Sequence, residues 1–152
     1  MPKASVKRLI ECKKKDLINL VLDIEKYPEF VPFCYDAKIY ENKDKGDLKN
    51  IIADLTIGKG PFKDTYKSDV IFDKKKDFIH VKNIEGPLNH LLNNWTFSDK
   101  QNGITEVTFD IDFEIKNKFL NSLMIVSFQF GLEKIADAFQ KRAEELFGNS
   151  KN

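Results

Sequence analysis

The chain has 152 residues, enough for one domain over residues 1–152 that buries a substantial core. Hydrophobic residues make up 41% of it and charged residues 32%, a composition typical of a folded soluble protein. The formal net charge is only +1, which argues against a domain dominated by contacts to nucleic-acid phosphates, so no DNA partner is expected.

The N-terminal segment is predicted to form a strand and then a helix. Residues Ser5–Cys12 alternate between apolar and polar side chains, as a half-buried strand does. Lys15–Glu25 then carries apolar residues at helical spacing, at Leu17, Leu20, Val21 and Ile24. Pro28 is expected to end this helix, because a residue before proline disfavours helical backbone angles. The following Pro28–Phe33 is predicted to form an elbow with aromatic side chains between two prolines.

Alternating segments in the middle of the chain predict five strands, over Ala37–Glu41, Leu48–Ile57, Phe62–Phe72, Phe78–Ile84 and Leu91–Ser98. Turn-forming residues separate them, including Gly58–Pro61 and Gly86–Pro87. Because these connections are short, we expect an antiparallel sheet, since parallel pairing needs long crossovers.

The C-terminal part gives the clearest pattern in the chain. A strand with one apolar and one polar face, Ile104–Lys116, runs directly into a long helix, Lys118–Phe147. The second half of this helix is amphipathic, whereas Phe119–Val126 is apolar nearly all round and must be covered on every side. A ligand, a partner or a membrane surface could supply this cover, and so could the protein's own loops and first helix. A one-sided sheet beside such a helix can enclose an apolar cavity.

No group of residues typical of catalysis or metal binding stands out. Cys12, Cys34, His80 and His90 lack the spacing of zinc ligands, and both cysteines are expected to be free thiols in a reducing compartment. His80 is expected to face solvent. His90 is expected in a loop, with no evident carboxylate partner in the sequence. We therefore predict no catalytic residue and no metal.

Charged residues fit a solvated surface. Asp110 and Asp112 share the polar face of the last predicted strand, where solvation is the simpler interpretation than a catalytic carboxylate pair. The runs Lys13–Lys15 and Lys74–Lys76 are typical of solvated turns. Contact with anionic lipid or RNA phosphates is the alternative for these two runs.

Three blocks of sequence carry a family resemblance. Residues 23–34 match the pattern D-x-E-x-Y-P-x-F-[LV]-P-W-C, with Phe33 in place of the tryptophan. Residues 86–97 match G-P-F…L-x-N-x-W-x-F, with Leu88 in place of the phenylalanine. The third block covers Val107–Glu114 and the helix through Ala143. With these blocks in order, the chain resembles the coenzyme Q-binding and ribosome-association toxin proteins of the START/polyketide-cyclase superfamily.

The resemblance implies an α+β helix-grip (START-like) fold, in which a curved antiparallel sheet wraps around the long C-terminal helix and leaves an apolar cavity. It implies a protein that is not an enzyme and needs no cofactor. Its expected ligand is ubiquinone (coenzyme Q) or a related polyprenyl lipid, carried in support of respiratory electron transport. One alternative is a toxin that binds the large ribosomal subunit and blocks subunit association. A further alternative is a polyketide cyclase-type enzyme.

In this fold the apolar strand faces, the elbow and the helix would surround the ligand. Asn93 and Tyr66 are the candidates for orienting a polar head group, and we expect Trp95 and Phe109 to face the cavity while Phe139 faces the core. The full set of expected ligand-binding residues is Tyr27, Phe30, Pro32, Phe33, Leu55, Tyr66, Leu91, Asn93, Trp95, Phe109, Phe113, Leu123, Phe128, Leu132 and Ile135.

The N-terminal residues show neither a signal-peptide apolar region nor an Arg-rich transit segment. A cytoplasmic location is therefore expected, with peripheral contact to an inner membrane. A mitochondrial inner-membrane location would require a presequence that has been removed.

Overall fold

The computed structural model describes residues 3–148, apart from the side chains of residues 59, 62, 120 and 123–127. In chain order its elements are β1 (Lys3–Ile10), α1 (Lys14–Leu22), the 3-10 turn η1 (Ile24–Lys26), α2 (Tyr27–Phe30), β2 (Cys34–Lys45), β3 (Leu48–Lys59), β4 (Phe62–Asp73), β5 (Phe78–Glu85), β6 (Leu88–Asp99), the 3-10 turn η2 (Gln101–Gly103), β7 (Thr105–Ile115) and α3 (Lys118–Phe147).

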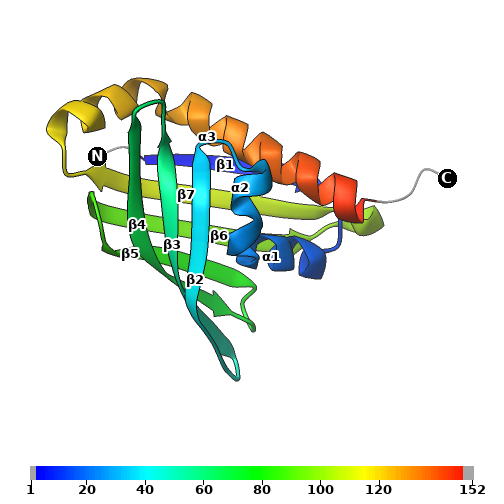
Figure 1. Cartoon of the computed structure of the whole chain (residues 1–152). Coiled ribbons are helices and arrows are strands. Elements are labelled where there is room, and N and C mark those ends of the chain that lie inside the picture. The colour runs from blue at the N-terminus through cyan, green and yellow to red at the C-terminus, as the bar shows by residue number, and fades with distance from the viewer. Residues whose placement is uncertain (1–2, 149–152) are drawn as a thin grey trace.

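The strands form one antiparallel sheet of seven in the order β1-β7-β6-β5-β4-β3-β2. The sheet is strongly curved, so that β2, β3 and β4 run across the direction of β1, β6 and β7, while α3 extends along β1 and β7 (Figure 1). Register shifts between β2 and β3, β4 and β5, and β6 and β7 contribute to this curvature, because a bulge bends its strand and increases its twist. The predicted α+β helix-grip fold is confirmed.

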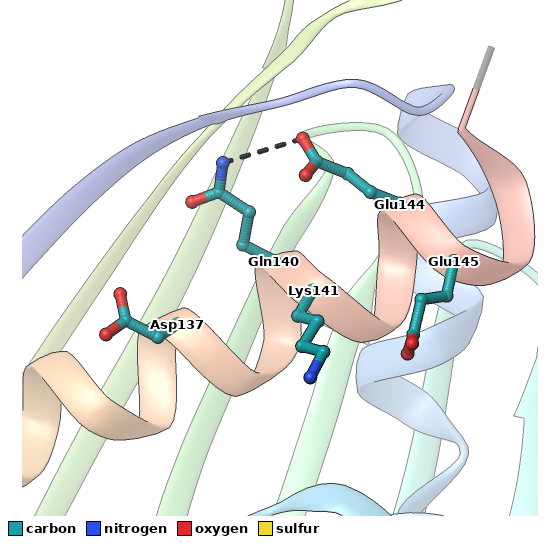
Figure 2. Close-up of a pocket in the computed structure, with 5 residues that line it drawn as sticks. All are labelled: Asp137, Gln140, Lys141, Glu144 and Glu145. Atoms are coloured by element: carbon teal, nitrogen blue, oxygen red, sulfur yellow. Dashed lines mark hydrogen bonds between the residues drawn. The ribbon is translucent and has the colours of Figure 1, made fainter. Parts of the chain in front are cut away.

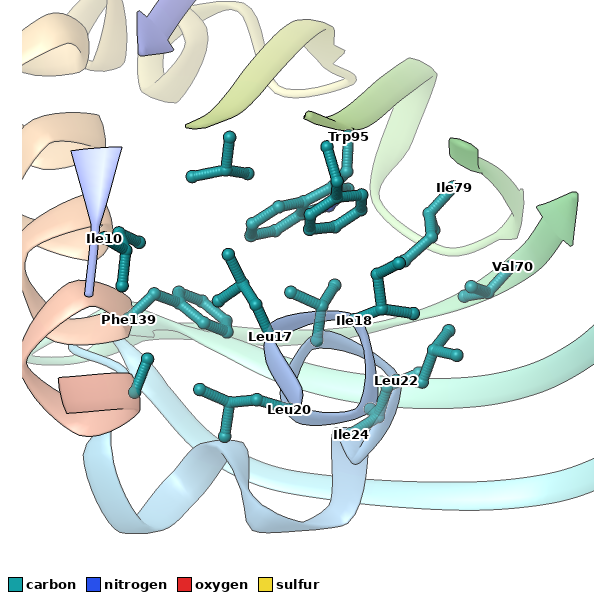
Figure 3. Packing of buried hydrophobic residues seen from close by; sticks show 14 of the residues in the cluster. Ile10, Leu17, Ile18, Leu20, Leu22, Ile24, Val70, Ile79, Trp95 and Phe139 are labelled. Atoms are coloured by element: carbon teal, nitrogen blue, oxygen red, sulfur yellow. The ribbon is translucent and has the colours of Figure 1, made fainter. Parts of the chain in front are cut away.

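One end of the concave side is a closely packed core, which we call the packed end. There α1 and the second half of α3 lie against the sheet, and their side chains interdigitate with those of the strands (Figure 3). Each large apolar side chain that is fully buried contributes about 1.5–3 kcal/mol to folding. Residues at most 5% exposed at this end include Ile10, Leu17, Ile51, Ile79 and Phe139.

Near the N-terminus the elements differ from the prediction in their bounds. The first strand is Lys3–Ile10 rather than Ser5–Cys12, because β1 pairs with β7 over these residues and the chain turns immediately afterwards. The first helix ends at Leu22, and η1 replaces its predicted last turn. Pro28 therefore does not end α1; it lies in the first turn of α2, where a missing N–H costs nothing.

The β2 strand is much longer than the predicted Ala37–Glu41, because its polar second half pairs with β3 in a long hairpin that no apolar alternation marks. The long C-terminal helix has the predicted bounds, Lys118–Phe147. Among the described residues, no helix combines the length and the apolar character needed to cross a bilayer.

Candidate functional site

A second apolar cluster lines the concave side away from the packed end, and we call it the Tyr66 end. Its buried members are Leu88, Leu91 and Phe113, and Tyr66 and Phe128 pack against them half-buried. The ring centroids of Phe113 and Phe128 are 4.7 Å apart. The cluster therefore joins β4, β6 and β7 to the first half of α3, and it brings together predicted ligand-binding residues from all four elements.

Tyr66 is held in place by close contact with Gly86. The backbone of Gly86 has a φ of +133°, and a Cβ atom there would lie 2.8 Å from the Cα of Tyr66. Glycine alone meets both requirements, because it tolerates positive φ and has no side chain to collide with its neighbour. The Gly-Pro pair that opens the second sequence block thus fixes the backbone of a predicted site residue.

The hydroxyl group of Tyr66 lies in a half-buried apolar setting and has no partner in the described part of the chain. Burial raises the pKa of this hydroxyl, and the neighbouring Cys34 adds to the rise. Among the described residues, none forms a hydrogen bond with it. A ligand oxygen that accepts a hydrogen bond from this hydroxyl would gain about 0.5–1.5 kcal/mol.

Asn93, the other predicted head-group residue, is already engaged. Its Nδ2 donates to the carbonyl oxygen of Asp110 at 3.2 Å, and its Oδ1 accepts from Nε1 of Trp95 at 2.9 Å. The Trp95 side chain is buried, and its ring lies 4.4 Å from that of Phe109 and 5.1 Å from that of Phe139. The structure thus places Trp95 within the packed end, and Asn93, unlike Tyr66, already has two hydrogen-bond partners.

The aromatic elbow links the packed end to the edge of the sheet. The Tyr27 hydroxyl donates a hydrogen bond to the carbonyl oxygen of Val21. The rings of Tyr27, Phe30 and Phe139 meet edge to face, with centroids 5.1–6.1 Å apart, an arrangement that aromatic quadrupoles favour. Pro32 lies half-buried just beyond this cluster. The predicted elbow is confirmed, and it lies beside the second half of α3.

Phe33 joins the elbow to α3 and to the β3–β4 hairpin. An added Cβ atom at Gly131 of α3 would lie 3.8 Å from the Phe33 ring, so the ring covers the helix where it has no side chain. The Phe33 carbonyl oxygen accepts a hydrogen bond from Gly58 N–H at 3.0 Å. Phe33 itself has a φ of +69°, which is rare for a bulky residue. An ion pair between Glu29 and Arg142, at 2.9 Å, fastens the elbow to α3.

The remaining predicted site residues are spread along the concave side. Leu55, Phe109 and Ile135 are half-buried against the packed end, whereas Leu132 is buried. The side chain of Leu123 lies outside the described part of the protein. The predicted residues therefore divide between the packed end, the elbow and the Tyr66 end, and only the last group combines half-buried apolar surface with an unpartnered polar group.

Two shallow hollows in the described part of the protein lie away from the concave side. One is on the exposed side of α3, where Gln140 Nε2 approaches Glu144 Oε2 at 3.5 Å (Figure 2); its lining residues are Asp137, Gln140, Lys141, Glu144 and Glu145. The other lies on the outer face of β1, β6 and β7. The apolar cavity expected between the sheet and α3 stays a prediction.

The outer face of the sheet holds one pair that the sequence did not reveal. Nε2 of His90 lies 3.5 Å from Oδ2 of Asp112. The expectation that His90 lies in a loop without a carboxylate partner was wrong, because His90 belongs to β6 and its partner comes from β7, where Leu92 pairs with Asp112. The other histidine, His80, is half-buried and contacts the side chain of Asn94 through Nδ1. Register across neighbouring strands, not spacing along the chain, creates both contacts.

The hydroxyl groups of Tyr66 and Tyr27 and the thiol of Cys34 are neutral at physiological pH. Burial raises the pKa of the Cys34 thiol to about 11. Burial also raises the pKa of the Tyr27 hydroxyl, and the nearby Tyr66 and Cys34 add to the rise. A neutral hydroxyl or thiol can donate a hydrogen bond, but it cannot serve as a general base at neutral pH. Tyr27 and Cys34 already donate to the carbonyl oxygens of Val21 and Asp36, so of these three groups Tyr66 is the one available to orient a ligand.

Comparison with known proteins places the chain in a family. The family described as "Polyketide cyclase / dehydrase and lipid transport" matches residues 13–140. The mitochondrial coenzyme Q-binding protein of Dictyostelium discoideum is 33% identical over 87% of this chain and 64% of that protein, so the chain spans less than two thirds of it. A ribosome association toxin of Rickettsia prowazekii is 32% identical over 91% of this chain and 94% of the toxin.

Solved structures agree with the fold. An 18 kDa protein from Caulobacter crescentus, solved in solution, superposes with a TM-score of 0.79 at 25% sequence identity, and the match covers 96% of this chain and 98% of that one. The shared architecture extends over nearly the whole length of both chains.

Proposed function

The chain belongs to the polyketide cyclase / dehydrase and lipid transport family, and we propose that it binds ubiquinone or a related polyprenyl lipid between the sheet and α3, as a carrier and not as an enzyme. The similarity to a coenzyme Q-binding protein supports the choice of ligand. The lipid would be the cargo, and the chain would hold it without changing it.

The observation that carries this proposal is the unpartnered hydroxyl of Tyr66 inside an apolar setting. Leu91, Phe113 and Phe128 offer apolar surface around it, while Tyr66 offers a single hydrogen-bond donor. A quinone presents the complementary chemistry, since its ring carries carbonyl oxygens on an otherwise apolar molecule. In this arrangement the quinone ring meets Tyr66 and the isoprenoid tail runs along the half-buried aromatic and aliphatic side chains.

Energetics explain why one polar contact would matter so much. Burial of each methylene group from water gains about 0.8 kcal/mol, but a lipid that leaves a bilayer has a tail that is already dry. The hydrophobic gain therefore nearly cancels between membrane and protein, and close packing with the ligand must hold the tail. Selection for a quinone then depends on the hydrogen bond from Tyr66, which is worth about 0.5–1.5 kcal/mol.

Lipid extraction from purified protein tests this proposal. The protein is produced in a host that makes ubiquinone, and the extract is analysed by mass spectrometry. We expect quinone in the wild-type extract and about three- to tenfold less in Tyr66→Phe, which loses only the hydroxyl. Tyr40→Phe is the matched control, because the Tyr40 hydroxyl bonds to Asp54 at 2.8 Å on the exposed surface. Wild-type protein that never yields quinone would contradict the proposal.

A second candidate, binding to the large ribosomal subunit, is favoured by the length of the match. The chain covers 94% of the ribosome association toxin but only 64% of the coenzyme Q-binding protein. Co-sedimentation with purified large subunits tests it. Binding through RNA phosphates should weaken steeply as salt rises, because contacts to lysine and arginine release counterions. Absence of co-sedimentation at low salt would exclude this candidate.

A further inference from the structure

The first half of α3 exposes two large aromatic side chains to solvent. Phe119 is 68% exposed and Phe130 is 65% exposed. They are eleven residues apart, which is close to three helical turns, so both lie on the same side of the helix. Burial of a phenylalanine side chain is worth about 1.5–3 kcal/mol. The isolated chain does not gain this free energy from Phe119 and Phe130, because both rings stay in solvent.

Lysines outnumber acidic residues around these phenylalanines, and the exposed Glu133, three residues after Phe130, is the nearest acidic residue in the helix. From Lys116 to Leu132 the sequence carries Lys116 and Lys118 and no acidic residue. Further along the helix, Nζ of Lys134 lies 4.7 Å from the centre of the Phe130 ring. The second half of α3 is different, because acidic residues predominate around the hollow on its exposed side (Figure 2). The exposed aromatic residues thus coincide with the basic part of the helix.

This side of α3 adjoins the proposed ligand site. Phe130 directly precedes Gly131, which the ring of Phe33 covers. The carbonyl oxygen of Phe33 in turn accepts the hydrogen bond from Gly58 of the β3–β4 hairpin. On the inner side of the same helix segment, Phe128 contacts Phe113. One stretch of helix therefore faces the site on one side and solvent on the other.

The end of the sheet near this junction repeats the pattern of an exposed aromatic ring with a lysine. Tyr35, at the start of β2, is 47% exposed, and Nζ of Lys63 lies 3.9 Å from the centre of its ring. Ile57, near the end of β3, is 38% exposed. Amphipathic pairs of this kind suit the boundary between apolar acyl chains and charged head groups.

We propose that this side of α3 binds the surface of an anionic bilayer, and we call it the docking face (Phe119, Phe130, Lys116, Lys118 and Lys134). The two phenylalanine rings would enter the boundary between head groups and acyl chains, while the lysines meet lipid phosphates. Charge complementarity selects the bilayer as the occupant, because the segment from Lys116 to Leu132 carries lysines and no acidic residue, and its projecting aromatic rings suit an anionic lipid surface. The role of the docking face in lipid exchange rests on the proposed function. Binding to a bilayer, by contrast, needs no bound quinone.

Vesicle flotation tests the docking face directly. The full chain is mixed with vesicles of phosphatidylcholine and phosphatidylglycerol, and with vesicles of phosphatidylcholine alone. We expect binding to the anionic vesicles that weakens with salt, and a loss of about tenfold or more in the double variant Phe119→Ser/Phe130→Ser. Lys118→Glu should reduce binding about fivefold.

Two controls on the same helix keep the test specific. Leu146→Ser removes a side chain that is 53% exposed at the other end of α3, and Lys141→Glu reverses an exposed charge beside the acidic hollow. Neither should change vesicle binding, and thermal melting of every variant confirms that it folds. The proposal is overturned if wild-type protein ignores anionic vesicles, or if the controls lose as much binding as the docking-face variants.

Quinone content is measured in the same preparations, so that the two proposals fail separately. Protein that binds vesicles but never yields quinone would refute the ligand and leave the docking face standing. Protein that yields quinone but does not bind vesicles would refute the docking face and support the proposed ligand. If large ribosomal subunits bind through Phe119 and Phe130 while vesicles do not, the face is a ribosome contact and membrane docking is refuted.

Discussion

The packed end and the Tyr66 end lie on the same sheet and draw on the same residue types, yet they differ in how completely they are covered. At the packed end α1 and the second half of α3 together bury Trp95 and Phe139. At the Tyr66 end, Tyr66 and Phe128 stay half-buried and one hydroxyl has no partner among the described residues. The contrast shows how one curved sheet can stabilise the fold at one end and offer a surface for ligand recognition at the other.

The sharpest test of the contrast removes a ring from each end. Phe139→Ala should lower the free energy of unfolding by about 3–5 kcal/mol, because it leaves a cavity in a close-packed core. Phe128→Ala should cost less than half as much, since its ring is only half-buried, while it should reduce the quinone content. Urea denaturation measures the first effect and lipid extraction the second. Equal losses of stability in the two variants would erase the distinction between the ends.

The next largest effect concerns the backbone support of Tyr66. Gly86→Ala should destabilise the protein by up to about 3 kcal/mol, because the new methyl group collides with Tyr66 and the positive φ strains alanine. Gly46→Ala is the matched control, since Gly46 has a φ of +76° but no atom within 4 Å of an added Cβ. Its cost should be only the conformational strain of about 1 kcal/mol. Thermal melting compares the two, and equal shifts would mean that contact with Tyr66 contributes nothing.

Alkaline pH should weaken the fold through two buried cysteines, Cys12 in the packed end and Cys34 close to Tyr66. Burial raises the pKa of Cys34 and of Cys12 to about 11 from the usual 9.0. The folded protein holds the two thiol protons more tightly than the unfolded chain does. Their contribution to the free energy of unfolding is therefore complete below pH 9 and is lost between about pH 9 and pH 11. Each thiol should account for a fall in unfolding free energy on the order of 2 kcal/mol. Chemical denaturation of Cys34→Ala and Cys12→Ala across this range measures it, and an unchanged pH dependence in both would contradict the assignment.

The substitution most informative about the ligand, Tyr66→Phe, should change stability the least. Tyr66→Phe should alter the free energy of unfolding by no more than about 0.5 kcal/mol in ligand-free protein, because the hydroxyl it removes has no partner to lose. A large destabilisation on urea denaturation would show that the hydroxyl supports the fold, and it would remove Tyr66 as the head-group donor.

The sequence was sufficient for the fold because its strongest patterns are local. Alternation in β7 and the apolar stripe of α3 follow from spacing along the chain, and Leu91, Asn93 and Trp95 are all buried on the predicted face. The second half of β2 was missed for the same reason. Its polar residues carry no alternation, and only pairing with β3 makes them a strand.

The candidate site was less predictable because its properties depend on contacts across the sheet. Asn93 and Tyr66 were equivalent candidates in the sequence, and only the structure shows that Asn93 is held by Trp95 and by a β7 carbonyl group. The contact between Gly131 and the ring of Phe33 was also missed, since a lone glycine in a helix gives no sign of the side chain that covers it. Gly86 belongs to the second family block, but its contact with Tyr66 becomes visible only in three dimensions.

The pairing of β1 with β7 sets the order in which a growing chain can complete this protein. Ile10 is paired opposite Thr105, and Lys3 opposite Asp112, so the first strand made must wait for nearly the last. On the ribosome β2 to β6 can assemble as successive hairpins, while β1 remains without its neighbour until β7 has emerged. Such long-range closure slows folding. During synthesis the first strand therefore stays available to chaperones and to mispairing until β7 has emerged.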